Sequence, residues 1–384
     1  MRRIAVFSFL WLPALALTLP AVEAHAADAG PSQSPAVGSA VGALPDSSHT
    51  AVVVTSREYF HSPGRFDVAD EGSSGWFGDL GFYVLSPSWS GSNPAFASSL
   101  GGVSTQTDFD HGASFAPLVQ IGFAGERGLG VRGRWWTLDS SDNLAIDGFS
   151  AADGTINGPS PLGTGGSFGS TPAALFTTTV VDGDFSSRLR MDVIDLEAIW
   201  KTTMGRSTLL LSSGVRYAHI GQTYDGSLIS ETTTLIGVGT RTSTLQASQT
   251  FNGAGPTFAM QAFREIGHTN LSVYGLGRGS VLFGESRQVA TGINDPLLGP
   301  TATTTASLFS NSLRPVMELE LGANWTRCIG NLELMAEGGF VGMVWYDAGN
   351  STNSDSILGG SAGTRNADQD LGLIGLRFAS GIRF

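Results

Sequence analysis

Three short strings in the sequence have the spacing of known chemical motifs. Residues 128–133 (GLGVRG) fit the glycine pattern of dinucleotide-binding sites, and residues 165–169 (GGSFG) and 359–363 (GGSAG) fit the pattern around a hydrolase nucleophile. The first string follows a turn and enters an alternating segment, whereas dinucleotide binding requires it to open a helix. The other two lie in Gly/Ser-rich stretches without a strand-to-helix turn. In a chain with 52 glycines, we interpret all three as chance matches and expect no cofactor.

Aspartate and histidine side chains offer a second kind of chemistry. Asp108, Asp110, His111, His219 and Asp225 fall near the ends of alternating segments, where a barrel hydrolase would place its acid and base groups. The sequence gives no pairing geometry among them, so we expect solvated side chains and treat a hydrolase as the least favoured function. No Cys or His cluster has the spacing of zinc ligands. We therefore expect neither an enzyme nor a metal site.

Charged residues at alternate positions form the largest constellation. Each lies in a segment whose other parity is apolar, so a strand would present charges on one face and apolar side chains on the other. The set is Arg132, Arg134, Asp195, Glu197, Arg216, Arg278, Glu318, Glu320, Glu333, Glu337, Arg377 and Arg383. Opposite signs on neighbouring strands favour ladders of ion pairs. Two interpretations stay open: a charged constriction that selects solutes, and a structural plug of salt bridges.

The elements that must position these charges are β-strands. In residues 371–384, one parity holds Ile374, Leu376, Phe378, Ile382 and Phe384, while Arg377 and Arg383 occupy the other. Arginine facing lipid at mid-bilayer would cost about 2–4 kcal/mol, so the apolar set should face lipid and the charged set the lumen. The chain ends on Phe384. A terminal aromatic of this kind resembles the signal that the barrel-assembly machinery recognises.

Ten such segments are separated by gaps that are alternately short and long. The short gaps are 125–128, 203–207, 267–270 and 329–331, and the long gaps are 89–114, 139–187, 225–250, 284–312 and 349–368. This alternation predicts an all-β fold, an up-and-down antiparallel transmembrane barrel of ten strands over residues 75–384, with short periplasmic turns and long extracellular loops. Twelve strands are the alternative, if residues 173–181 or 228–245 hold a further hairpin. A secreted β-sandwich is disfavoured, because charges fill the second face and aromatics gather near the segment ends.

The start of the chain and its composition agree with export. Residues 1–26 have the basic, apolar and small-residue regions of a cleavable signal peptide, and Pro13 disfavours a transmembrane anchor. Residues 27–74, rich in Pro, Ser and Gly, predict a flexible periplasmic segment. No later apolar run approaches the roughly 18 residues of a spanning helix. A net charge of -12 disfavours nucleic acid as a partner, and a single cysteine excludes an internal disulfide.

Four stretches together resemble the Legionella-type major outer-membrane protein family. They are residues 193–200 (VIDLEAIW), 214–223 (GVRYAHIGQT), 251–256 (FNGAGP) and 345–350 (WYDAGN). The resemblance covers roughly residues 75–384 and implies a pore-forming barrel in the cell outer membrane with no catalytic residues. We expect a porin-like channel for passive diffusion of small solutes or ions, with a structural or adhesive barrel with a plugged lumen as the alternative. The implied partners are outer-membrane lipid, lipopolysaccharide and the barrel-assembly machinery.

Overall fold

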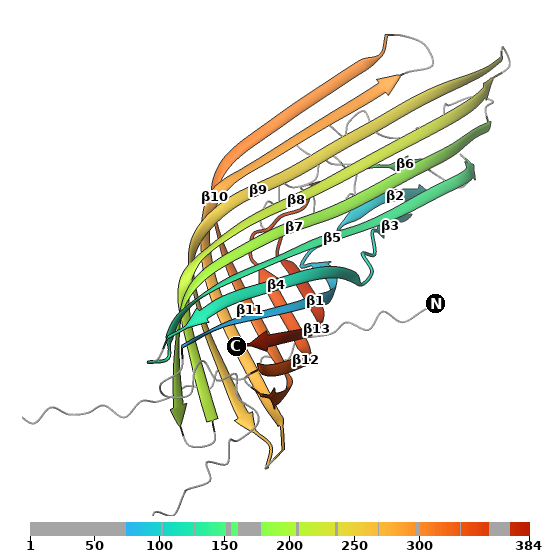
Figure 1. Cartoon of the computed structure of the whole chain (residues 1–384). Coiled ribbons are helices and arrows are strands. Elements are labelled where there is room, and N and C mark those ends of the chain that lie inside the picture. Colours follow the sequence, from blue (N-terminus) through green and yellow to red (C-terminus); the bar gives the residue numbers. More distant parts are fainter. Residues whose placement is uncertain are drawn as a thin grey trace, which may run out of the picture. The chain divides into compact units, whose positions relative to one another are not determined.

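A computed structural model describes residues 74–100, 103–125, 127–150, 155–159, 178–204, 207–234, 237–267, 269–295, 300–330, 332–352 and 369–384. Its strands are β1 (Gly75–Trp89), β2 (Pro94–Leu100), β3 (Val103–Asp108), β4 (Ser114–Ala124), β5 (Leu129–Ser150), β6 (Thr155–Asn157), β7 (Thr178–Met204), β8 (Ser207–Thr234), β9 (Gly237–Glu265), β10 (Leu271–Asp295), β11 (Ala302–Ile329), β12 (Leu332–Trp345) and β13 (Leu371–Arg383) (Figure 1). No helix in this part of the chain is long and apolar enough to cross a membrane. The predicted signal peptide and nearly all of the predicted periplasmic segment lie outside the described residues.

Ten of these strands close into an antiparallel barrel. Its order is β1-β13-β12-β11-β10-β9-β8-β7-β5-β4, and β1 pairs with both β13 and β4 to complete the ring (Figure 1). The predicted ten-strand barrel is confirmed. Residues 228–234 and 237–245 lie in β8 and β9, which pair with each other there, so these residues supply no additional barrel strand. Residues 173–177, from the other stretch proposed for an extra hairpin, lie outside the described residues.

One end of the barrel carries the short connections, the start of β1 and the C-terminus. Gly128, Gly267 and Gly330 lie in these connections with positive φ angles of 74°, 64° and 63°, a conformation that glycine adopts without a steric penalty. The backbone N–H of Phe384 donates to the carbonyl oxygen of Trp76 (3.2 Å) at the same end. Short turns are the periplasmic connections of bacterial barrels, so this end faces the periplasm.

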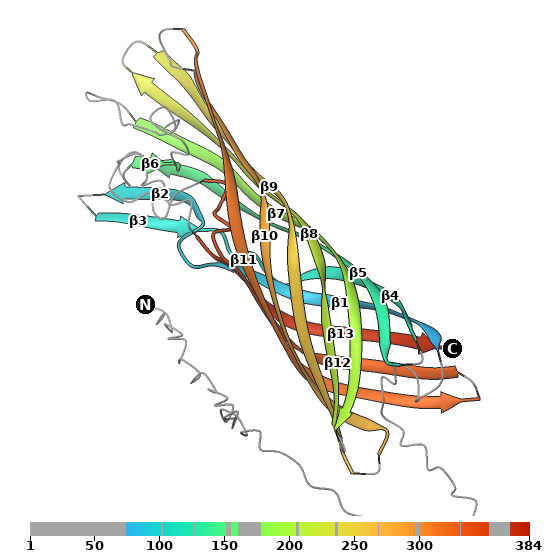
Figure 2. The same cartoon turned by 90° about the vertical axis from the view of Figure 1, so that its left-hand side faces the viewer.

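Six strands continue well beyond the closed ring at the opposite end (Figures 1 and 2). β5 and β7 to β11 contain 22 to 29 residues each, whereas a spanning strand needs only about 9–11. We call this part the outer extension; it comprises residues 137–150, 178–192, 219–234, 237–252, 285–295 and 302–314. Much of it was predicted as loop, because Thr, Ser and Gly dominate it and few apolar residues mark its alternation. These residues form strands because neighbouring segments of the chain pair along their length, for example Asn143 of β5 with Ser186 of β7.

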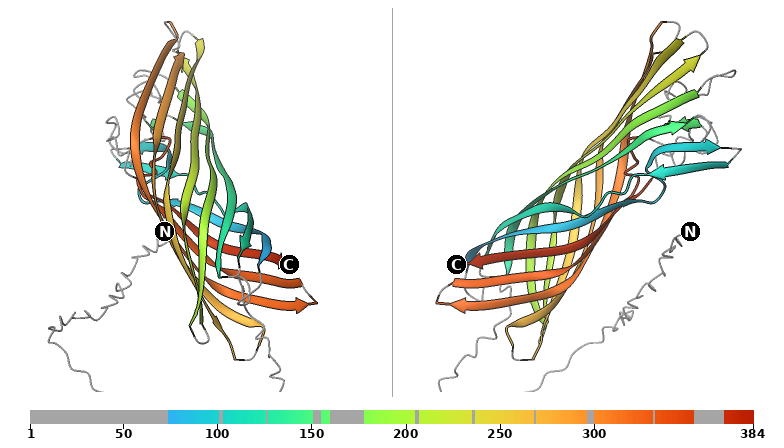
Figure 3. Two further views of the ribbon diagram at one scale, coloured as in Figure 1. Left: turned by 60° about the vertical axis from the view of Figure 1, so that its left-hand side comes forward. Right: turned by 90° about the vertical axis from the view of Figure 1, so that its right-hand side faces the viewer.

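A second, three-stranded sheet of order β3-β2-β6 lies at the outer end (Figure 3). It falls within stretches predicted as loops, so it corrects that prediction. The Tyr224 hydroxyl of β8 donates to the carbonyl of Ala95 (2.8 Å), and the rings of Phe96 and Phe185 stack at 5.0 Å. Apolar side chains of β2, β7, β8 and β9 therefore form a core under this sheet.

The outer surface of the ring carries an apolar band. Leu196, Leu319 and Phe340 are each more than 60% exposed, which suits side chains that face hydrocarbon. Trp135 of β5 pairs in register with Ile194 of β7, which pairs with Tyr217 of β8. Aromatic side chains of this kind gather at membrane interfaces. The outer edge of the membrane therefore lies near this level, and the outer extension projects beyond it.

Candidate functional site in the barrel interior

Ten of the twelve predicted lumen residues are buried inside the ring. We call them the charged layer: Arg132, Arg134, Asp195, Glu197, Arg216, Arg278, Glu318, Glu320, Glu337 and Arg377. Glu333 and Arg383 lie nearer the periplasmic end, are partly exposed and face each other at 3.7 Å. Phe384, the predicted assembly signal, follows Arg383 in the sequence and is exposed. Burial away from water is costly for ten charges, so each must find a partner of opposite sign.

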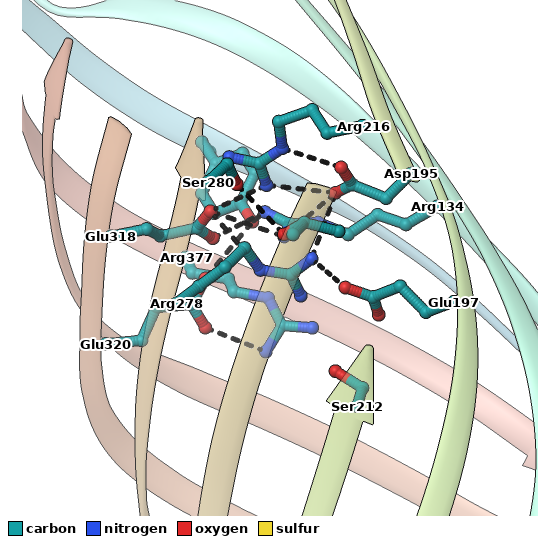
Figure 4. A network of polar contacts seen from close by, with 12 residues as sticks. Arg134, Asp195, Glu197, Ser212, Arg216, Arg278, Ser280, Glu318, Glu320 and Arg377 are labelled. Atoms are coloured by element: carbon teal, nitrogen blue, oxygen red, sulfur yellow. Dashed lines mark hydrogen bonds and ion pairs between the residues drawn. The ribbon is translucent and has the colours of Figure 1, made fainter. Parts of the chain in front are cut away.

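Some of these charges pair along the barrel wall. Register places Arg132 opposite Glu197, and the Arg132 Nη2 atom donates to Glu197 Oε2 at 2.5 Å. Asp195 lies opposite Arg216 in the same way, and Arg216 Nε donates to Asp195 Oδ1 at 2.6 Å (Figure 4). These contacts join neighbouring strands of opposite sign. Period-2 alternation places such residues on one face, so this part of the site could be predicted from the sequence.

Other contacts cross the lumen between strands that are not neighbours. Glu318 of β11 accepts from Arg134 of β5 (2.6 Å) and from Arg216 of β8 (3.2 Å) (Figure 4). Arg278 of β10 donates to Asp195 of β7 at 3.1 Å and also contacts Glu197. The interior is thus narrow enough for single side chains to reach its opposite wall.

Arg377 anchors a second group of contacts. Its Nη1 atom donates to Glu337 Oε2 at 2.5 Å and lies 3.4 Å from Glu320 Oε2. The Tyr83 hydroxyl donates to Glu320 (3.2 Å) and accepts from Arg134 (2.6 Å). Tyr83 therefore joins the two groups into one network.

Asp79 and Tyr83 belong to this region but were not among the predicted lumen residues. Asp79 is 2% exposed and accepts a hydrogen bond from Gln120 Nε2 at 2.8 Å. Asp79 and Tyr83 share the inward parity of β1 with Phe77 and Leu85, and all four are buried. That parity was the available signal, but glycines and serines in β1 obscure its alternation.

An apolar layer lies on the extracellular side of the charged layer. On β5, for example, the inward positions after Arg134 are Trp136 and Leu138, both fully buried. The large members of this layer are Leu85, Leu118, Trp136, Leu138, Leu189, Met191, Val193, Ile220, Phe251, Leu282, Val316, Val341, Met343, Trp345, Leu371 and Leu373. All ten barrel strands contribute to the cluster that includes them. The lumen is therefore lined mainly by large apolar side chains at this level, and the buried guanidinium of Arg314 lies over the Phe251 ring (4.0 Å).

A segment of chain is inserted into the barrel beyond the apolar layer. Residues 348–352, which follow β12, are buried, and the backbone turns through Asp347 (φ 54°) and Gly349 (φ 66°). We call residues 346–352 the inserted segment. Most of it was predicted to lie in an extracellular loop, so its position corrects that prediction. It stays inside because a row of side chains can satisfy its backbone carbonyl groups.

Three glutamines form that row. Gln222, Gln249 and Gln288 lie opposite one another on β8, β9 and β10. Their Nε2 atoms donate to the carbonyl oxygens of Gly349 (3.1 Å), Ala348 (3.2 Å) and Ser351 (3.2 Å), respectively. We call these three residues the glutamine row. Buried backbone carbonyls need such donors, and the row supplies one to each of the three.

The cavity beside the charged layer is small. The space within it that can hold the centre of a water molecule amounts to about 30 Å³, lined by Tyr83, Gln120, Arg134, Arg278 and Arg377 among others. One water needs roughly 10–15 Å³ on this measure. About two water molecules would therefore fit there, which is too little for a hydrated solute.

The residues considered for hydrolysis form no hydrogen-bonded acid–base pair among the described residues, although Asp110 adjoins His111 and its backbone N–H donates to Asp142 (2.8 Å). His111 is buried between the hydroxyls of Ser140 (3.2 Å) and Ser187 (3.1 Å), and burial lowers its pKa. His219 instead lies on the outer surface of β8, 2.7 Å from Asn252. Asp225 is exposed on β8, and Asp108 accepts a hydrogen bond from Gln106 at the end of β3. Neither histidine is hydrogen bonded to a carboxylate in the described ranges.

Among the described residues, the short motifs and possible metal ligands form no second site. Residues 128–133 form a turn and the start of β5, as expected for a chance match. Residues 165–169 and 359–363 lie outside the described residues. Within the described ranges, no group of three or more His, Cys, Asp or Glu residues is placed to hold a metal ion.

Comparison with known proteins places this barrel in a family. The chain is similar to the outer-membrane protease OmpT from Escherichia coli (12% identity, TM-score 0.39, 81% of this chain and 96% of that chain) and to a FadL homologue from Pseudomonas aeruginosa (8%, 0.22, 81% and 90%). No curated protein sequence matches the chain. The family profile described as the Legionella pneumophila major outer membrane protein precursor matches residues 84–383, which confirms the predicted resemblance. The protein therefore belongs to the Legionella major outer membrane protein family and resides in the outer membrane.

Proposed function

We propose that this protein is a closed outer-membrane barrel that holds the outer extension at the cell surface, rather than an open diffusion pore. The observation that supports this function most strongly is the stacking of the charged layer on the apolar layer. Five arginines and five carboxylates neutralise one another across the lumen, and a core of large apolar side chains follows them. Of the two functions expected from the sequence, we thus favour the structural barrel with a plugged lumen over the porin-like channel.

The physical reason is the cost of removing an ion from water. A solute moving along the barrel axis would leave the charged layer and meet side chains such as Trp136 and Trp345, which are fully buried. An ion in an apolar environment loses hydration worth several kcal/mol even after relaxation. The apolar layer therefore blocks ions, and the charged layer blocks larger solutes by filling the cross-section. No catalytic role is proposed.

A gated channel for small ions is the second candidate. Well-packed apolar residues are often as stabilising as buried ion pairs, so a lumen that retains ten charges suggests a use for them. The inserted segment is also attached to β8, β9 and β10 through side-chain hydrogen bonds. Its release, together with repacking of the apolar layer, would extend the polar path toward the charged layer.

Planar-bilayer conductance distinguishes the two functions. A closed barrel should show no stepwise openings, either as the native protein or with Gln222, Gln249 and Gln288 all replaced by Ala. A gated channel should open in the triple variant, and Gln246→Ala, an exposed position on β9, serves as the matched control. Fluorescently labelled protein counted in the same membrane ensures that silence reflects closed barrels. Reproducible openings of the native protein would refute the closed barrel.

Outer-membrane lipid, lipopolysaccharide and the barrel-assembly machinery remain the proposed partners. The exposed apolar band suits the lipid, and Phe384 is the residue proposed as the assembly signal. Replacing Phe384 by Ala should slow assembly in cells without changing the stability of the assembled barrel. Equal assembly of the two forms would remove that role.

A further inference from the structure

The outer extension has two edges, unlike the closed ring. β5 pairs with β4 only through residues 130–136, and β11 pairs with β12 only from Val316 onward. Beyond these points, residues 137–150 and 302–314 each pair with one neighbour among the described strands (Figures 1 and 2). In an antiparallel ladder every second residue directs its N–H and C=O away from its partner. Both edges therefore present backbone donors and acceptors.

The β5 edge carries several features that discourage pairing. Asp139, Asp142 and Asp147 place charges along it, and Gly148 has a positive φ of 65°. The pairing register also shifts between Ile146 and Phe149. Charges and bulges are the devices by which natural sheets prevent edge-to-edge association. This edge is protected.

The β11 edge lacks these features. Residues 302–313 (ATTTASLFSNSL) contain no charged residue, proline or glycine. Their register with β10 runs without a shift from Ala302 to Leu313. The strand is accessible from both faces: Phe309 on one face is 65% exposed and Leu308 on the other is 39% exposed. A long, regular, uncharged edge is a template for another strand.

We infer that the outer edge of β11, residues 302–313, binds an extended and uncharged peptide segment of another protein by strand addition. Backbone hydrogen bonds would supply the affinity, and side chains at alternate positions would contact Phe309 on one face and Leu308 on the other. The nearest charges of β10, Glu285 and Arg287, are one strand away, and Arg287 is directed over the Phe309 ring at 5.1 Å. The strand directly opposite the bound segment would thus carry no charge of its own, which favours an uncharged segment.

A second copy in the same membrane fits this edge poorly. Two such copies would be related by an axis along the membrane normal, and barrel strands tilt by about 35–45° from it. Their β11 strands would then cross at about 70–90° instead of pairing. The inference rests on the proposed surface-anchoring function only in placing this edge outside the cell; it does not depend on a closed lumen.

Amide hydrogen exchange on the full chain in lipid nanodiscs tests the inference. The probe is a twelve-residue peptide with the sequence of residues 302–313. The control is the same peptide with its backbone N-methylated at alternate positions. Saturating probe should slow exchange at alternate amides of residues 302–313 at least tenfold and leave residues 137–150 unchanged. The control peptide should have no effect. Because conductance is measured separately, a conducting barrel that still binds the probe would refute only the closed lumen.

A matched pair of variants tests the position of the binding edge. Thr305 of β11 and Thr291 of β10 lie opposite each other, with their hydroxyls 3.3 Å apart. Thr305→Lys and Thr291→Lys lose the same contact and add the same charge, but only the first changes the edge strand. Thr305→Lys should weaken probe binding at least tenfold, and Thr291→Lys should retain most of it. Equal losses of probe binding in the two variants would overturn the inference. It would also be overturned if the outward amides of residues 302–313 were already protected in the free protein, because another part of this chain or a second copy would then occupy the edge.

Discussion

Replacing Arg377 by Met should strongly destabilise the barrel, and replacing Glu337 by Gln in the same chain should restore part of the loss. Arg377 Nη1 lies 2.5 Å from Glu337 and 3.4 Å from Glu320, and all three side chains are at most 8% exposed. Met keeps most of the volume but removes the charge, so two carboxylates lose a counter-ion in a confined space. Breaking a buried pair from one side costs about 3–5 kcal/mol.

The double variant determines how much of that cost is the pair itself. Glu337→Gln removes one of the two orphaned charges and keeps an oxygen for the hydrogen bond from Asn324 (2.9 Å). Contacting residues couple by about 0.5–3 kcal/mol, and full burial favours the upper part of that range. Glu320 still faces the missing guanidinium in the double variant, so the restoration should be partial.

Urea unfolding of the refolded protein in detergent micelles, followed by tryptophan fluorescence, gives the four free energies of the cycle. The exposed pair Arg188–Asp139 is the matched control, and its coupling should lie within measurement error because solvent screens it. Additive effects of Arg377→Met and Glu337→Gln would refute the pairing. An unchanged stability of Arg377→Met would refute the inward assignment of β13.

Three further changes test the other layers. Gln249→Ala should leave the buried Ala348 carbonyl without its donor, at a cost of about 1–3 kcal/mol, seen as faster hydrogen exchange in the inserted segment, while Gln246→Ala should not change it. Trp136→Ala should destabilise the barrel by about 3–5 kcal/mol in the same urea assay, because it leaves a cavity in the apolar layer. Burial lowers the pKa of His111, so the unfolded state binds a proton more readily as pH falls below about 6.5. Acidification from pH 7 to pH 5 should therefore loosen the outer mouth and speed its hydrogen exchange. His111→Gln should flatten that pH dependence.

Much of the fold was determined by sequence pattern alone. Alternation with a period of two places apolar side chains on one face of each strand, and the cost of arginine in lipid assigns the charged face to the lumen. The alternating gap lengths then gave ten strands with both ends in the periplasm. Pairs such as Arg132–Glu197 followed as well, because adjacent strands bring inward residues of similar depth together.

Tertiary structure decided which charges meet across the lumen. Arg134 and Glu318 are 184 residues apart and belong to non-adjacent strands, so their contact depends on ring closure, ring width and strand stagger. The outer extension and the inserted segment could not be predicted from the alternation of apolar and polar residues either, because Thr, Ser and Gln are as common in polar loops as on hydrated strands. The glutamine row has a purpose only when chain folded back into the barrel presents carbonyl groups to it. Local periodicity specifies faces, whereas the closing of the lumen depends on contacts between faces far apart in the sequence.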